Sequence, residues 1–108
     1  MRPNDEASVE MCEQIDAWKR EYGRIYAYDV GDTTFYFRPV TRPQYREIMS
    51  KLVGGPSERE EQLCRMMVLW PLDFDYSSPA APAGVATVLS DAILDKSGFA
   101  TKGEPKEL

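Results

Sequence analysis

The stretch RIYAYDVGDTTFYFR, residues 24–38, decides the fold of this chain because it predicts a β-hairpin. Two runs rich in aromatic and β-branched residues, 24–30 and 33–38, flank Gly31-Asp32, and two-residue loops of this kind join hairpin strands in a type I′ or II′ turn. The loop fixes a register that pairs Val30 with Thr33, Tyr28 with Phe35, and Tyr26 with Phe37. These six side chains share one face, which helices must cover because an isolated two-stranded ribbon is marginally stable.

Helical patterns lie on both sides of the hairpin. The first covers about residues 4–22 and ends at Gly23, a typical helix stop. Its apolar stripe consists of Met11, Ile15, Trp18 and Tyr22. After the hairpin, Thr41 and Gln44 form a capping box that predicts the start of a second helix.

Two more helices are expected further along the chain. Ser57 and Glu60 predict the start of the third, and its apolar spacing continues as far as Trp70, where Pro71 ends it. The fourth begins near residue 85, and Gly98 is expected to end it with Phe99 packing back.

The expected architecture is therefore α+β, a two-stranded antiparallel β-hairpin packed against about four α-helices in the order α-β-β-α-α-α. No further strand is expected, and both edges of the hairpin are open to strand addition. A chain of 108 residues suffices for one domain with a core that needs no disulfides. Residues 1–99 are expected to form this single domain, and residues 100–108 a flexible polar C-terminal tail.

Composition excludes several classes of function. The chain has 13 Lys and Arg against 18 Asp and Glu, and this net charge of −5 argues against nucleic-acid binding, which needs a phosphate-neutralising surface. It has 0 histidines, which removes histidine-based acid–base catalysis, histidine-activated nucleophiles and most zinc or haem ligation. No apolar run is long enough for a membrane span and no signal-peptide pattern is visible, so a cytosolic protein is expected.

The remaining reactive side chains do not form a catalytic constellation. Cys12 and Cys64 are expected to be small core residues in a reducing compartment, with a disulfide between them as the alternative. Asp73 and Asp75 are expected to be solvated loop acids or caps, because calcium requires six or more oxygen ligands. We therefore expect no enzymatic activity, no metal site and no cofactor.

The chain instead offers features suited to protein binding. The basic cluster of Arg38, Arg42 and Arg46 is expected either to grip an acidic partner or phosphate or, more ordinarily, to pair with the glutamates at positions 10, 13 and 47. The nearly unbroken apolar run MMVLWPL, residues 66–72, is either central in the core or partly turned toward a partner. Methionine suits an adaptable apolar groove.

The stretch FYFRPVTRPQY, residues 35–45, resembles a pattern found in small tail-assembly proteins of tailed bacteriophages, where a strand ending in Phe-x-x-Arg-Pro leads into a helix. Later landmarks of the same kind are VLWP at 68–71, AGV at 83–85 and SGF at 97–99. The resemblance covers roughly residues 18–99 in order. Chaperones of this group often have an extended or frameshifted C-terminal segment, which the polar residues 100–108 do not clearly show.

The resemblance implies a non-catalytic chaperone-like protein that binds a tail protein (tape-measure, tube or baseplate) during tail morphogenesis. It places the chain in the cytoplasm of a bacterial host, with the virion as the alternative, and an oligomer is compatible with it. A structural subunit of the tail or baseplate and a small acidic regulator that binds a host protein are the alternative functions. The residues expected to bind the partner are Tyr36, Arg38, Arg42, Met49, Met66, Met67 and Trp70.

Overall fold

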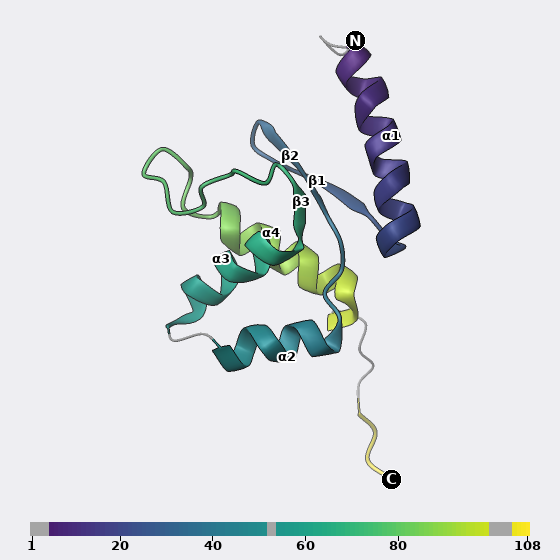
Figure 1. The fold of residues 1–108 in the computed structure, drawn as a ribbon. Coiled ribbons are helices and arrows are strands. Elements are labelled where there is room, and N and C mark those ends of the chain that lie inside the picture. The colour runs from purple at the N-terminus through teal and green to yellow at the C-terminus, as the bar shows by residue number, and fades with distance from the viewer. Residues whose placement is uncertain (1–4, 52–53, 100–104) are drawn as a thin grey trace.

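The computed structural model describes residues 5–51, 54–99 and 105–108, which together form an α+β fold (Figure 1). The elements in chain order are α1 (Asp5–Tyr22), β1 (Tyr26–Val30), β2 (Thr33–Phe37), α2 (Arg42–Lys51), α3 (Pro56–Met67), β3 (Val68–Trp70), α4 (Val85–Leu94) and the short π-helical turn η1 (Asp95–Phe99). The α+β class predicted from the sequence is confirmed. The first residues of the chain and most of the expected C-terminal tail lie outside the described residues.

The hairpin and its register are as expected. The pairs Val30 with Thr33, Tyr28 with Phe35, and Tyr26 with Phe37 are all present between β1 and β2. In the loop, Gly31 has a φ of 61°, and no described residue other than a glycine has a positive φ. The loop therefore fits a type II′ turn, in which only the first loop residue requires positive φ.

The expectation of only two strands, with the third helix reaching Trp70, is wrong. Val68, Leu69 and Trp70 form β3, which lies antiparallel beside β2 in a sheet of order β1-β2-β3. β3 pairs Val68 with Phe37 and Trp70 with Tyr36, so Leu69 is the extra residue of a β-bulge. The bulge lets Val68 face the core while Trp70 faces outward. The open edges of the sheet are consequently β1 and β3, because β3 occupies the free edge of the hairpin.

The core lies between the inner face of the sheet and the helices that follow it. Phe35 and Phe37 are 0% and 1% exposed, which confirms that this face of the hairpin is covered, whereas Tyr28 at its margin is 38% exposed. α3 packs against α4, and α4 packs against β1. The buried apolar residues are Phe35, Phe37, Val40, Ile48, Leu63, Cys64, Met67, Val68, Tyr76, Val85, Ala86, Leu89 and Ile93.

Local hydrogen bonds explain where α2 and α3 begin. At α2, the Gln44 side-chain oxygen accepts from the Thr41 N–H at 3.0 Å and the Thr41 hydroxyl accepts from the Gln44 N–H at 3.4 Å, which confirms the predicted capping box. At α3 the predicted box is wrong by two residues. The Glu58 carboxylate accepts from the Gly55 N–H at 2.9 Å, so Glu58 caps the helix, while Glu60 accepts from the Thr87 hydroxyl of α4 at 2.9 Å.

α1 stands apart from the rest of the fold. In Figure 1 its C-terminal end lies near the start of β1, and its N-terminal end points away from the sheet and the other helices. None of the buried core residues comes from the part of α1 whose side chains the structure describes. Among the described side chains, the buried core is therefore formed by the elements from β2 to α4.

Candidate functional site

An exposed aromatic surface covers the outer face of the sheet. We define this outer surface as the side chains of Trp18, Tyr22, Tyr36, Arg38 and Trp70. Tyr36 lies at its centre, with its ring centroid 6.0 Å from that of Trp18 on α1 and 6.1 Å from that of Trp70 on β3. Trp70 is 45% exposed and Tyr22 is 38% exposed, so large parts of the aromatic rings remain open to solvent.

Arginine completes the outer surface. The guanidinium carbon of Arg38 lies 4.5 Å from the Tyr22 ring centroid, a cation–π arrangement. The Nε atom of Arg38 is buried and has no hydrogen-bond partner among the described residues. Arg42 lies apart from this surface, with its guanidinium 5.5 Å from the ring of Tyr45. Both arginines thus lie over aromatic rings, and these cation–π contacts were not predicted from the sequence.

The apolar stripe of α1 extends beyond the outer surface. Trp18 and Tyr22 contact Tyr36 and Arg38 at the C-terminal end of the helix. Ile15 and Met11, about one and two turns before Trp18, are only half-buried. The helix therefore presents apolar side chains that the chain's own core does not use.

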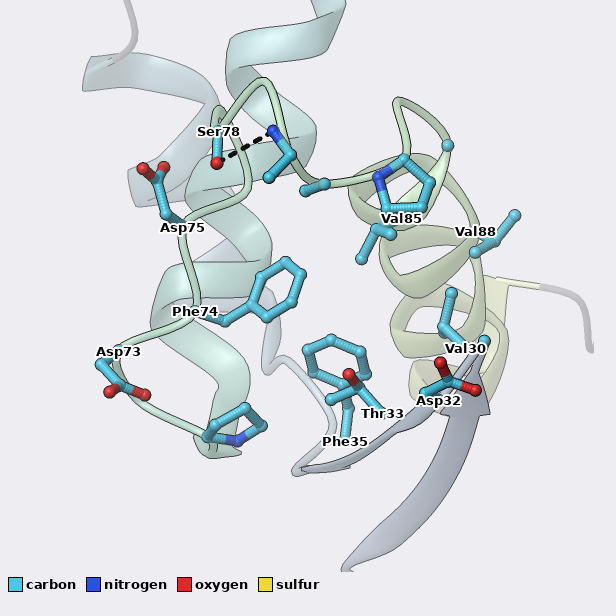
Figure 2. A pocket seen from close by; sticks show the side chains of 16 residues that line it. Val30, Asp32, Thr33, Phe35, Asp73, Phe74, Asp75, Ser78, Val85 and Val88 are labelled. Carbon is cyan, nitrogen blue, oxygen red and sulfur yellow. Dashed lines mark hydrogen bonds between the residues drawn. The ribbon is translucent and has the colours of Figure 1, made fainter.

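A cavity of about 920 Å³ lies beside the inner face of the sheet, between the hairpin loop, residues 71–84 and the start of α4 (Figure 2). The Phe35 and Phe74 rings meet edge to face at 5.1 Å in the interior. Val85 and Val88 approach from α4. The cavity is lined mainly by apolar side chains, and Val88 is 39% exposed at its margin.

Three aspartate residues contribute to the lining of this cavity. Asp32 comes from the hairpin loop, and Asp73 and Asp75 come from the segment that follows β3. Figure 2 shows the carboxylates of Asp73 and Asp75 at the edge of the cavity, apart from the two phenylalanine rings. Asp75 accepts hydrogen bonds from the Ser77 N–H at 3.1 Å and the Ser77 hydroxyl at 2.8 Å, which confirms its expected role as a loop cap.

The structure brings together only some of the residues predicted to bind a partner. Tyr36, Arg38 and Trp70 meet on the outer surface, whereas Arg42 lies at the start of α2. Met49 and Met66 are half-buried against the core, and Met67 is fully buried within it. The apolar run 66–72 is thus part of the core at Met67 and Val68, whereas Leu72 at its end is 80% exposed.

Sequence reasoning missed two groups of contributors. Trp18 and Tyr22 were recognised as a helical stripe but not as part of a surface shared with the sheet. Phe74 and Tyr76 are not among the residues predicted to contribute, yet both rings pack on Phe35. The alternation Asp-Phe-Asp-Tyr at 73–76 was the available signal, because period-two alternation indicates an extended segment with one apolar side.

The potentially reactive side chains of the described residues serve structural roles. Burial raises the pKa of the Cys64 thiol to about 12, and its Sγ donates to the Ala86 carbonyl oxygen at 3.5 Å. Burial also raises the pKa of the Tyr76 hydroxyl. Cys12 is exposed rather than in the core as expected, and both cysteines are free, so the alternative of a disulfide is also wrong. The described residues contain no cluster of three or more Cys, Asp or Glu that could hold a metal ion.

Comparison of the chain with protein-family models, curated proteins and solved structures found no match. Among the described helices, none combines the length and the apolar character needed to cross a membrane.

Proposed function

We propose that this chain is a non-catalytic phage tail-assembly protein that holds a tail protein through α1 and the outer surface. The observation that carries the proposal is the apolar stripe of α1, which continues past the sheet although the core is closed without it. An amphipathic helix in water is stabilised mainly by covering its apolar face, so this stripe is suited to a partner. The resemblance at residues 35–45 and 68–71 supplies the class of partner.

The composition of the outer surface supports binding of a protein. Tryptophan, tyrosine and arginine are the residue types that dominate binding energy in protein interfaces. Here Trp70 and Tyr36 form a cross-strand pair, and Arg38 lies over a tyrosine of α1. An apolar segment of a tail protein laid along α1 would cover the stripe and the exposed ring of Trp70 together.

Coexpression with the proteins encoded by the adjacent reading frames tests the proposal. The wild-type chain is expected to keep one tail protein soluble and to co-purify with it. A double variant, Met11→Ser with Ile15→Ser, is expected to lose this capture because it removes apolar side chains from the stripe. Ala17→Ser is the matched control, since it adds serine to the same helix away from the stripe and costs at least as much helix propensity per substitution.

The outcome separates the three functions. Capture that depends on the stripe, with little of the chain in purified virions, supports the assembly role. High copy number in virions by mass spectrometry would instead identify a structural subunit of the tail or baseplate. Salt-sensitive binding to a host protein, with no capture of a tail protein, would identify an acidic regulator. Equal capture by the double variant and by Ala17→Ser would show that the stripe of α1 is not part of the binding surface.

A further inference from the structure

The cavity on the inner side of the sheet has no role in the proposed capture by α1. Its interior residue Phe35 and the outer-surface residue Tyr36 are neighbours on β2, so their side chains point to opposite faces of the sheet. Its volume of about 920 Å³ lies within the range of roughly 300–1,000 Å³ typical of ligand sites. The cavity is therefore a second and separate place for a ligand.

Apolar side chains determine what can enter the cavity. Phe35 and Phe74 form its interior, and Val30, Val85 and Val88 lie on the opposite side in Figure 2. A ligand group that replaces water here is favoured when it is itself apolar, because the lining offers few hydrogen-bonding partners.

The surrounding charges determine what can lie next to that group. Asp32, Asp73 and Asp75 contribute to the lining, and none of the lysines or arginines that the structure describes does. Asp73 and Asp75 lie at the edge of the cavity, apart from the phenylalanine rings. A ligand group seated between the rings and the valines therefore leaves these carboxylates free for a cation that the same ligand carries at the edge of the cavity.

We infer that the cavity receives an apolar side chain from an extended segment of a partner protein, and that this segment carries lysine or arginine beside that side chain. The stripe of α1 from a second copy is a poor occupant on charge, because Glu10, Glu13 and Asp16 lie on the same stretch of the helix as Met11 and Ile15. Like charges brought together at an interface are unfavourable. The inference thus adds a second contact of defined chemistry to the proposed protein-binding function.

Three short fluorescent peptides test the inference with the full chain by fluorescence anisotropy. One alternates leucine with lysine, one alternates leucine with glutamate, and one alternates serine with lysine. Only the leucine–lysine peptide is expected to bind saturably at salt below about 0.1 M, where charges interact over about 10 Å. Equal binding of the serine–lysine peptide would show simple charge attraction, and equal binding of the leucine–glutamate peptide would show that the carboxylates play no part. Either result overturns the inference, as does the absence of binding.

Substitutions in the chain then show where the peptide binds. Asp32→Asn with Asp73→Asn is expected to weaken binding about threefold to tenfold, as for the loss of two exposed ion pairs. The matched control, Asp16→Asn with Asp91→Asn, removes the same charge from exposed positions that do not line the cavity. Equal weakening in both double variants would overturn the inference.

A blocked cavity and the α1 variant complete the test. Val88→Lys places a long cation at the exposed margin of the cavity and is expected to abolish binding, with the thermal midpoint measured to confirm folding. The Met11→Ser and Ile15→Ser variant is expected to bind the peptide normally. Loss of peptide binding in that variant would overturn the assignment to the cavity, whereas failure of tail-protein capture with intact peptide binding would overturn the proposed function alone. Concentration-dependent self-association that Val88→Lys abolishes would identify a second copy as the occupant and overturn the inference.

Discussion

Replacement of Ser97 by alanine tests the hydrogen bonds that attach the segment before α2 to the end of α4. The Ser97 hydroxyl accepts from the Val40 N–H at 2.9 Å and donates to the Ile93 carbonyl oxygen at 2.6 Å. Val40 is 7% exposed and belongs to the core. The alanine side chain has no acceptor for the Val40 N–H, so the variant leaves a backbone donor unsatisfied at the edge of the core.

The size of the effect follows from this geometry. An orphaned buried donor costs about 1–3 kcal/mol, and the Val40–Ser97 bond is only partly buried. We therefore expect Ser97→Ala to lower the free energy of unfolding by about 1–2 kcal/mol, in the lower part of that range. For a domain of this size, 1 kcal/mol corresponds to a fall of roughly 4 °C in the thermal midpoint.

Ser90→Ala provides the matched control. Ser90 is 2% exposed, and its hydroxyl donates to the Thr87 carbonyl oxygen within the same helix at 2.9 Å. Its removal orphans no backbone N–H of the described residues, and alanine favours the helix more than serine does, so we expect a loss below about 1 kcal/mol. Urea unfolding followed by circular dichroism measures both variants. Equal destabilisation by the two substitutions would refute the reasoning, because the cost would then come from losing a buried hydroxyl and not from the Val40 N–H.

Three further outcomes are expected from urea unfolding and thiol labelling. The pKa of Glu58 is lowered by hydrogen bonds, chiefly from its own backbone N–H. The stabilisation from its carboxylate is therefore present above the unfolded pKa and is lost as pH falls through the folded pKa. Glu58→Gln should thus be destabilising at neutral pH and equal to wild type in strong acid. A thiol reagent should modify Cys12 in the native chain and Cys64 only after unfolding, and modification of both without urea would contradict the burial of Cys64. Phe35→Ala should cost about 3–5 kcal/mol, whereas Tyr28→Ala, its cross-strand partner at the exposed margin, should cost below about 1 kcal/mol, and similar losses would contradict the location of the core.

The parts of the fold that were predictable are those set by neighbouring residues. The Gly31-Asp32 loop determines the hairpin register by its length, and Thr41 and Gln44 satisfy each other's backbone groups within four residues. β3 could not be recognised in this way. Trp70 continues the apolar spacing of the preceding helix, and only the free edge of β2, distant in sequence, makes an extended backbone favourable there.

The candidate site was predictable only where one element supplies it. Tyr36 and Trp70 were both proposed from their own segments, but their pairing depends on the bulge in β3. Met67 was proposed for the partner surface because helical spacing alone does not distinguish the core side of a helix from an exposed apolar side. The cavity was not predictable at all, since it is formed by residues from the hairpin loop, the segment after β3 and α4.

In the proposed function, the core and the binding surface belong to different parts of this chain. The core runs from β2 to α4, and its buried residues include none of the described side chains of α1. α1 has 18 residues, a length near the limit at which an isolated helix is marginal in water. The contacts of Trp18 and Tyr22 hold its C-terminal end. Covering Met11 and Ile15 would stabilise the rest of the helix and bind the partner in the same step. Substitutions in the stripe should therefore impair binding far more than they lower the stability of the core.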